Sequence, residues 1–529
     1  MSSSFPIFKS WVPDWLVKIV LFSTILPSMV LFFLPLANIN AAAGHYGGEP
    51  ADIQFAVALF YAGYAGFYAL ERRFFSYLAT KEYFVIFTVL QILLSTACYF
   101  TSQLYVFFPL RFIQGMLFAS TVNLSLALMF TRLKSERARE VSFSVFFCML
   151  LLAMPFNNLI TADVIDSFNF NIVYKCTVFS YLPGLLLVLT AMNNIRLNVR
   201  FPLYKLDWQS FVLLSLLLVA FGYCMIYGQE YYWLTDRRIL SVCIACAFML
   251  LVFILRQRSM KRPYTDLRVF SSRNFKVGLL LLLILYICRF ASGITNNFFT
   301  IALKFDPMHV SYINTFNIAG LIAGVILSCC LILQKKKIRL IWLPGFALLF
   351  VFHFIMLFLF NPEANPDVFF LPLFLQGLGV GMLLVPIIVF SISSVSVVLG
   401  SSASAFLLIM RYVGFCLSIA LINYYELYGR SKHYNTFQEN LTSADIPVKK
   451  QLAMGAGRLA ARGLLKTEAY TGTPKLMINA INTQTHLHFA MDYYERMCWL
   501  LLTTILLIAL FPYLNRTMVN LRSKQLSPA

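Results

Sequence analysis

Residues 109–117 read PLRFIQGML, and residues 372–379 read PLFLQGLG. The two stretches share a Pro-Leu start and a Gln-Gly pair, and these pairs lie 262 residues apart, at Gln114 and Gln376. Each stretch falls inside an apolar run that is long enough to cross a bilayer. The same shift carries the first apolar run of the chain onto the ninth, and the fifth onto the thirteenth. The sequence therefore predicts two duplicated halves.

The composition is that of a membrane protein. Of the 529 residues, 60% are hydrophobic and 12% are charged, whereas soluble domains carry about 25% charged residues. The net charge of +20 would suggest nucleic-acid binding in a soluble chain, but here the basic residues cluster between apolar runs. There they meet the anionic headgroups of membrane lipids. We therefore expect membrane lipids, and no nucleic acid, as partners.

The eleven cysteines lie almost wholly inside the apolar runs, where a thiol behaves as a small hydrophobic group. Cys243 and Cys246 form a CxxC, but no second pair or histidine cluster completes a metal site. We expect no disulfide, no metal and no cofactor.

Fourteen apolar runs reach the length of a spanning helix, which is about 20 residues. The predicted fold class is therefore all-α integral membrane, with helices grouped as six, two and six. The expected spans are about 17–38, 53–71, 83–101, 105–130, 141–162, 173–193, 208–228, 238–255, 277–299, 309–333, 339–360, 367–390, 402–424 and 497–514.

Basic residues alternate between the connecting segments, which predicts the topology. With the N-terminus in the cytoplasm, the cytoplasmic segments hold 26 Lys and Arg residues and the short outer loops hold four. Short cytoplasmic loops are enriched in Lys and Arg. We therefore expect both termini on the cytoplasmic side. No cleavable signal is expected before the first span, because that run has full spanning length.

The grouping of the fourteen spans as six, two and six predicts three domains. Residues 1–195 form an N-terminal six-helix bundle, and residues 196–276 form a two-helix insert with its cytoplasmic loops. Residues 277–529 form a C-terminal six-helix bundle that includes a long periplasmic loop, 425–496, with weakly helical pieces. This loop has two possible roles. It could be a solvated cap over the outer mouth of the transporter, or it could be a docking surface for a periplasmic partner.

Three arginines fall inside the expected spans: Arg111, Arg289 and Arg411. A guanidinium near the centre of a spanning helix costs about 2.5–3.5 kcal/mol on insertion scales, so it usually faces a cavity or a partner. The acidic candidates, Asp52 and Glu71, flank the second span instead. An electropositive cavity would favour anionic or zwitterionic substrates. The alternative is that each guanidinium donates to helix carbonyls in a packed interface.

Other polar and aromatic residues at membrane depth are further candidates for the substrate or proton pathway. An aromatic stripe recurs along one helix face and fits either packing, which we prefer, or a cavity wall. The asparagines fit substrate contact and hydrogen bonding between helices equally. These candidates are Tyr61, Tyr64, Tyr68, Gln114, Asn296 and Asn297.

Small residues and one proline are assigned to packing and conformational roles. GLGVG would suggest a nucleotide site after a strand, but inside a spanning helix it predicts close helix packing. The residues in this group are Gly115, Pro155, Gly377, Gly379 and Gly381.

Several motifs resemble the major facilitator superfamily, and within it the fourteen-span drug:proton antiporters of the EmrB/QacA type. They are LRFIQG from Leu110, LDWQSFVLLSLLLVAFGYCMIYGQEYYW from Leu206, RPYTDLRVFSSRNF from Arg262, LQGLGVGMLLVP from Leu375 and SSASAFLLIMRYVGFCLSIAL from Ser401. The resemblance covers most of the chain. It implies an inner-membrane antiporter fold, and it matches Arg111 to the basic residue implicated in proton transfer in this family.

The chain departs from the family pattern at three places. The first span reads LPSMVLFFLPLANIN without the usual Asp, the loop after the second reads ALERRFFSYLATKEY, and the fifth keeps only Pro155 of its motif, as MPFNNL. Either Asp52, Glu71 or a different driving ion must replace the missing carboxylate, or coupling to protons is lost.

The resemblance and the residues favour a secondary-active exporter of small molecules that works by alternating access, with protons as the coupling ion. Family members of double-membrane bacteria pair with a periplasmic adaptor and an outer-membrane channel. An uptake carrier for an anionic nutrient or siderophore is the first alternative. A membrane-embedded transferase is a remote one, because only His353 among the six histidines lies well inside a span and no acid accompanies it. We expect no enzyme.

Overall fold

A computed structural model describes residues 7–132, 138–195, 206–334, 336–441, 445–463 and 465–510. Within these ranges the chain is helical, and the one β-bridge joins Phe8 to Met192. Fourteen of the described helices are long and apolar enough to cross a membrane. The predicted all-α fold with fourteen spans is confirmed.

The N-terminal spans and the insert run as a series of long helices with one short helix near the start. They are α1 (Asp14–Ala37), α2 (Ile39–Tyr46), α3 (Pro50–Tyr77), α4 (Thr80–Phe100), α5 (Leu104–Arg132), α6 (Ala138–Ser167), α7 (Ile172–Ala191), α8 (Trp208–Tyr227), η2 (Trp233–Thr235) and α9 (Arg237–Ser259).

The remaining spans follow after a short 3-10 turn. They are η3 (Leu267–Ser271), α10 (Arg273–Phe290), α11 (Ser292–Ile301), α12 (Pro307–Leu333), α13 (Arg339–Leu359), η4 (Pro366–Phe369), α14 (Phe370–Ser393), η5 (Val397–Leu399), α15 (Gly400–Asn440), α16 (Ile446–Ala461) and α17 (Lys466–Leu510).

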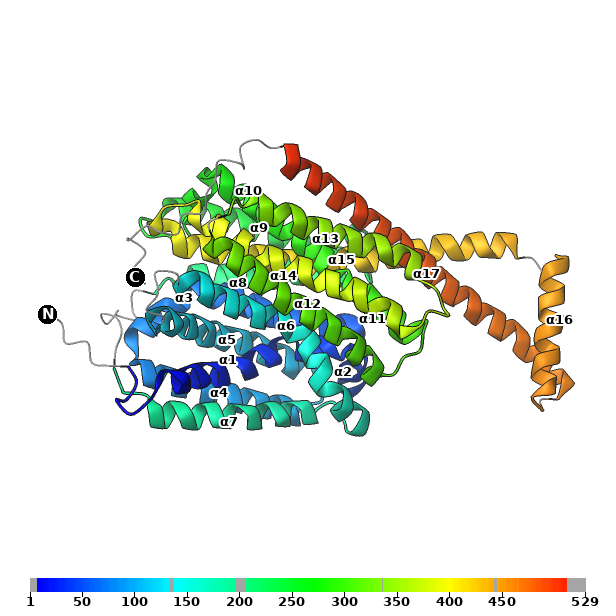
Figure 1. Cartoon of the computed structure of the whole chain (residues 1–529), viewed down its shortest axis with the longest axis horizontal. Coiled ribbons are helices and arrows are strands. Elements are labelled where there is room, and N and C mark those ends of the chain that lie inside the picture. Colours follow the sequence, from blue (N-terminus) through cyan, green and yellow to red (C-terminus); the bar gives the residue numbers. More distant parts are fainter. Residues whose placement is uncertain are drawn as a thin grey trace.

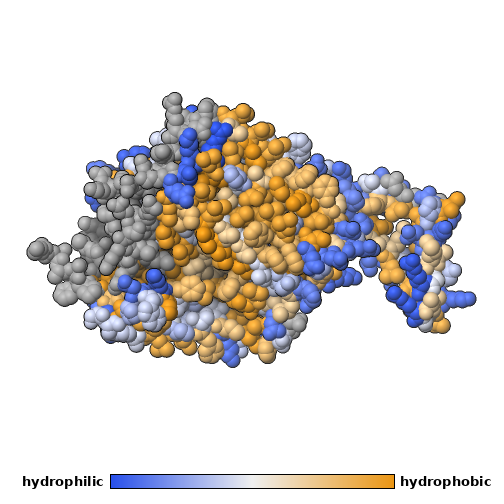
Figure 2. Space-filling view, viewed as in Figure 1, coloured by the Kyte–Doolittle hydropathy of each residue, from blue (hydrophilic) through white to orange (hydrophobic). Residues whose placement is uncertain are grey.

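The spans lie side by side in one bundle (Figure 1), and an apolar belt crosses its middle on the face that Figure 2 shows. Large apolar side chains stay exposed within the spans, for example Leu186, Phe248 and Phe358. In water such exposure would oppose folding, whereas in a bilayer the same side chains contact lipid tails. The belt is therefore the surface that faces the membrane core.

The expected long loop 425–496 is largely helical, which corrects the sequence interpretation. Helix α15 continues to Asn440, α17 already begins at Lys466, and α16 lies between them. Beyond the belt, α15 and α17 project together as an arm, with α16 across its far end (Figure 1). We call this outer part, residues 425–496, the arm. Residues 442–444 and 464 of the arm lie outside the described residues, as do 511–514 of the last expected span and the expected domain boundary at 196.

Contacts between α15 and α17 explain why the arm is helical. The ring of Phe489 packs where a side chain at Gly429 would stand, and His433 Nε2 lies 3.1 Å from Asp492 Oδ2. Arg430 and Glu426 form an ion pair one turn apart on α15. These pairings stabilise two helices outside the membrane, where neither is apolar enough to be recognised by hydropathy.

Glycines bring three pairs of helices into close contact. A Cβ at Gly115 of α5 would stand 1.9 Å from the carbonyl oxygen of Phe60 on α3. In the same way, Cβ atoms at Gly377 and Gly381 of α14 would stand 2.3 and 2.6 Å from carbonyl oxygens of α12. A Cβ at Gly379 would instead point toward α13 and stand 3.0 Å from the carbonyl oxygen of Gly345. Small residues let spanning helices approach in this way.

The neighbour relations of the first six spans recur in the last six. Helix α1 packs on α6, α3 on α5 and α4 on α7, and correspondingly α10 packs on α15, α12 on α14 and α13 on α17. The two sets meet where α6 packs on α12 and α3 on α15, and α8 of the insert packs on both α3 and α15. This recurrence supports the proposed division into two halves with an insert.

Candidate functional site

Arg111 is fully buried between α5 and α1. Its guanidinium donates to the carbonyl oxygens of Leu31, at 3.0 Å, and Phe32, at 2.8 Å. Pro35 has no N–H, so the carbonyl of Leu31 lacks its usual helical donor and is free to accept this bond. The charge also lies 4.5 Å from the centre of the Phe60 ring. Arg111 therefore joins two helices of the first half, as in the packed-interface alternative.

Gln114 completes this arrangement one turn further along α5. Its Oε1 accepts a 3.0 Å bond from Arg111, and its Nε2 lies 3.5 Å from Cys98 Sγ on α4. Neither residue lines either of the two pockets described below. Their predicted place in a substrate or proton pathway stays a prediction.

Arg289 stands at a break in the ninth span. Helix α10 ends at Phe290 and α11 begins at Ser292, followed by Gly293. Adjacent Ser and Gly residues are a common cause of such kinks. The Ser292 hydroxyl donates to the Arg289 carbonyl at 2.9 Å, and broken helices at this depth are typical of transporter binding sites.

The Arg289 side chain crosses from the second half to the first. Its terminal nitrogen donates to the carbonyl oxygen of Leu151 on α6, at 3.1 Å. Pro155 lies four residues after Leu151 and supplies no N–H, so this carbonyl too lacks its helical donor. Arg111 and Arg289 thus show the same arrangement. In each, the guanidinium donates to a backbone carbonyl oxygen whose usual helical donor is missing because a proline lies four residues later.

A pocket of polar side chains surrounds Arg289, between α6 of the first half and α10, α11, α12 and α14 of the second. We call it the amide pocket. It encloses about 520 Å³ of space, part of which is open to solvent. Its polar lining consists of Asn158, Arg289, Ser292, Asn296, Asn314, Asn317 and Gln376.

Hydrogen bonds hold several of these amides in place. Asn314 Nδ2 lies 3.4 Å from Asn296 Oδ1, and Asn317 Nδ2 donates to Gln376 Oε1 at 3.1 Å. The Oδ1 of Asn158 is buried without a partner among the described residues. Asn297, by contrast, is exposed and lies outside this pocket, so its proposed role gains no support from the geometry.

Arg411 lines a second pocket, which we call the aromatic pocket. It encloses about 410 Å³, part of it open to solvent, between α3, α5 and α6 of the first half and α14 and α15 of the second. Its lining includes Tyr64, Tyr68, Phe143, Phe146, Phe147 and Arg411. The Nε of Arg411 donates to Tyr286 Oη at 2.9 Å, and one terminal nitrogen is buried without a partner among the described residues.

The predicted tyrosine stripe is divided between packing and pocket lining. Tyr61 is buried against Phe32 and Tyr412, with ring centroids 5.0 and 5.7 Å away. Tyr64 and Tyr68 line the aromatic pocket. Tyr61 therefore serves packing, whereas Tyr64 and Tyr68 form part of a cavity wall.

Neither acidic candidate lines either pocket. Asp52 accepts hydrogen bonds from Tyr227 Oη, at 2.5 Å, and from the Glu49 N–H, at 2.9 Å. Glu71 is buried and accepts a 2.6 Å bond from Tyr83 Oη. None of the ion pairs among the described residues joins a carboxylate to Arg111, Arg289 or Arg411.

Glu230 is an acidic group that sequence reasoning missed. It lies in the loop after α8 and keeps contact with solvent. Partial burial, together with the nearby carboxylates of Glu49 and Asp52, raises the pKa of Glu230 to about 7. Its neighbours come from residues some 180 positions earlier, so no local pattern in the sequence marks it.

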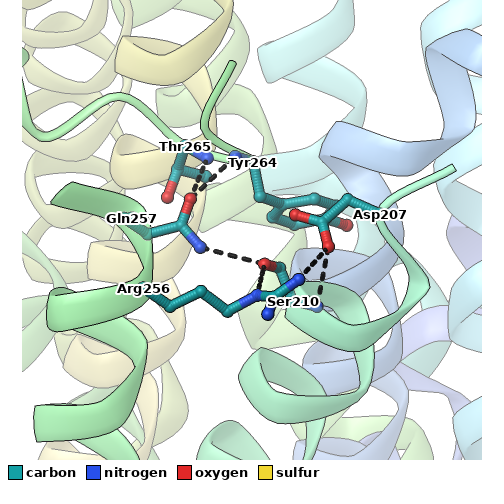
Figure 3. A network of polar contacts seen from close by, with 6 residues as sticks. All are labelled: Asp207, Ser210, Arg256, Gln257, Tyr264 and Thr265. Carbon is teal, nitrogen blue, oxygen red and sulfur yellow. Dashed lines mark hydrogen bonds and ion pairs between the residues drawn. The ribbon is translucent and has the colours of Figure 1, made fainter. Parts of the chain in front are cut away.

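A polar network joins residues of the insert (Figure 3), and two further hydrogen bonds tie it to α3 and α15. Gln257 accepts from the backbone N–H groups of Tyr264 and Thr265, at 2.7 and 3.2 Å, and donates to Ser210 Oγ at 3.1 Å. Tyr264 Oη donates to the Gly66 carbonyl on α3 at 2.6 Å, while the N–H of Asp266 donates to Ser402 Oγ on α15 at 3.0 Å.

An ion pair closes the other side of this network. Arg256 lies 2.9 Å from Asp207, and the two residues join the start of α8 to the end of α9. Burial alone would raise the pKa of Asp207, but hydrogen bonds from Ser210 and Arg256 outweigh it and lower the pKa. Asp207 is therefore charged over the whole physiological range.

Metal-ligating side chains do not cluster in the described part of the chain. Among these residues, no group of three or more His, Cys, Asp or Glu side chains could hold a metal ion. His353 is buried on α13 and its Nδ1 contacts the Leu349 carbonyl at 2.7 Å.

Comparison with known proteins places this geometry in context. No family model matches the chain. The colistin resistance protein EmrB of Acinetobacter baumannii is 20% identical over 377 residues, which cover 69% of this chain and 71% of that protein. The multidrug export protein EmrB of Escherichia coli K12 is 23% identical over 312 residues, which cover 56% of this chain and 58% of that protein.

Solved transporter structures share the fold over nearly the whole chain. The peptide transporter POT in complex with sulfate aligns with a TM-score of 0.60 at 11% identity, over 97% of this chain and 98% of that one. A POT family transporter in complex with 5-aminolevulinic acid gives the same score and identity, over 95% and 99% of the two chains. The chain therefore has fourteen candidate membrane spans and the fold of solved transporters of the major facilitator type, and it is similar in sequence to the EmrB export proteins.

Proposed function

We propose that the protein exports small molecules from the cytoplasm across the inner membrane by proton-coupled alternating access, with both termini in the cytoplasm. The observation that carries this proposal is the position of Arg289 and Arg411. Both line pockets between the two halves, and neither has a carboxylate partner among the ion pairs of the described residues. The sequence similarity to EmrB export proteins supports export, rather than uptake, as the direction of transport.

The positions of the two pockets fit two successive substrate-binding sites in such a transport cycle. The aromatic pocket includes Phe143 and Ser404, near the ends of α6 and α15 that lie away from the arm. The amide pocket includes Asn158 and Asn314, near the arm ends of α6 and α12. Rocking of the halves would expose first one pocket and then the other.

Transport by purified protein in proteoliposomes with an imposed pH gradient tests coupling. We expect gradient-driven transport that falls in Arg111→Ala and in at least one of Asp52→Asn and Glu71→Gln. Arg111 anchors α1 to α5, and the two carboxylates lie at the two ends of the second span. Transport by all three variants at the parental rate would refute these assignments.

Direction is tested in cells of an efflux-deficient host that accumulate a fluorescent dye. We expect expression to lower the dye content. A rise in content would instead support the uptake carrier of the same fold, for an anionic nutrient or siderophore.

We further propose that the arm docks a periplasmic adaptor, which leads to an outer-membrane channel. The arm carries exposed apolar side chains, including Ile446 and Leu465, beside exposed Lys449 and Lys450. Ile446→Asp combined with Leu465→Asp should remove co-purification with the co-expressed adaptor while leaving transport in proteoliposomes intact. Unchanged co-purification would refute the dock.

A further inference from the structure

We propose that the amide pocket binds a small organic acid through its anionic group, and that this group takes Arg289 away from the Leu151 carbonyl. When that bond breaks, the two halves can separate on the side of the molecule that carries the arm. The inference rests on the proposed alternating access and adds the site, the ligand chemistry and the event that opens it.

The bond from Arg289 to Leu151 links the halves at one point. The donor lies on α10 and the acceptor on α6, 138 residues apart, with 3.1 Å between them. Because Pro155 cannot donate, the Leu151 carbonyl depends on Arg289 for this hydrogen bond. When the halves separate on the arm side, both groups lose their partner in a site of low dielectric, which is unfavourable for each. The bond therefore acts as a latch.

The pocket around the latch offers the guanidinium a better acceptor. None of its lining residues is Asp or Glu, so an anion that enters meets a positive charge and no negative one. A carboxylate would bond to Arg289 more strongly than the neutral Leu151 carbonyl does, because both partners are then charged. In this proposal the anion draws the guanidinium toward itself and off the Leu151 carbonyl, so that the bond to the anion replaces the latch.

The rest of the lining narrows the ligand further. The Oδ1 of Asn158 is buried and lacks a donor among the described residues, so a ligand N–H or O–H would satisfy it. Apolar side chains, including Met154, Leu321 and Val380, complete the wall. The site fits an organic monoanion that carries a hydrogen-bond donor beside the anionic group and an apolar remainder.

A double-mutant cycle tests the latch. In Pro155→Ala the new N–H of residue 155 donates to Leu151 within α6 and competes with Arg289, while Arg289→Gln removes the charged donor. Ser311→Cys serves as the reporter, because Ser311 is buried at the contact between α12 and α6, where its Oγ lies 2.9 Å from the Asn158 carbonyl. Labelling by a membrane-impermeant maleimide from the outer side is measured in a Cys176→Ser background.

We expect each single variant to raise the labelling rate about tenfold and the double variant to raise it no further, since both changes break one bond. Pro183→Ala in α7 is the matched control, because Pro183 lies outside both pockets. It should leave labelling unchanged. Unchanged rates in both single variants, or multiplicative effects in the double variant, would overturn the latch.

The ligand class is tested on purified protein in detergent with anthranilate, whose carboxylate neighbours an amine, and with its neutral counterpart 2-aminobenzamide. We expect anthranilate to raise the midpoint of thermal unfolding of the parent and of Arg411→Gln, but not of Arg289→Gln. An equal effect of 2-aminobenzamide, a loss of the shift in Arg411→Gln alone, or no shift in the parent would overturn the site. Neither measurement requires transport, so a failure of the proposed export leaves these results interpretable.

Discussion

Glu230 shows how neighbours distant in sequence set the behaviour of one residue. Its pKa is raised from the ordinary 4.5 to about 7, by partial burial and by the carboxylates of Glu49 and Asp52. A raised pKa means that the folded state holds the proton more tightly than the unfolded state. The resulting contribution to stability is present below about pH 4.5 and is lost as the pH rises through about 7.

Replacement of Glu230 by Gln should flatten this pH dependence. We expect the thermal midpoint of the parent in detergent to fall between pH 5 and pH 8 by more than that of Glu230→Gln. Glu363→Gln, at an exposed carboxylate of the loop after α13, should follow the parent. A Glu230→Gln curve parallel to that of the parent would show that this group does not titrate in the window.

Arg111 permits a second prediction at the residue scale. Arg111→Leu leaves the Leu31 carbonyl without a donor, at a cost of about 1–3 kcal/mol for this unsatisfied buried group, and removes one of the donors to the Phe32 carbonyl. The thermal midpoint should therefore fall. Adding Pro35→Ala restores an N–H for Leu31 within α1 and should recover part of the loss. A double variant that is less stable than Arg111→Leu would contradict the role assigned to the proline.

At the scale of elements, the contact between α3 and α5 depends on the absence of a side chain. A Cβ at Gly115 would stand 1.9 Å from the Phe60 carbonyl oxygen, a distance that the backbone can relieve only by moving the helices apart. We expect Gly115→Ala to reduce the yield of monodisperse protein severalfold in size-exclusion chromatography. Gly44→Ala, where nothing lies within 4 Å of the added atom, should match the parent. Equal yields for the two variants would remove the packing argument.

The helices themselves could be predicted from the sequence, because each must bury about 20 apolar residues in lipid. The seventh span, expected at 208–228, is α8 at Trp208–Tyr227. The arm could not be predicted in this way, since its helices are stabilised by contacts such as that between His433 and Asp492 rather than by hydropathy. The break between α10 and α11 was likewise missed, although Ser292 and Gly293 mark its place.

At the scale of the whole molecule, the sequence marks the arginines at membrane depth but does not show what they contact. Arg289 stands out because a cation at membrane depth is rare, and Pro155 because it lies within a span. Their connection through the Leu151 carbonyl depends on how α10 meets α6 across the two halves, and no local pattern encodes that register. Tyr286, which receives the Arg411 bond, was missed for the same reason.

The length of α15 has a mechanical consequence. Its 41 residues extend for about 60 Å, of which about 30 Å lies beyond the membrane core. Because α15 belongs to one half, a tilt of that half by about 10° would sweep the far end of the helix through about 5 Å. The helix is thus a lever that converts a small rotation inside the lipid into a displacement which a protein outside the membrane can sense.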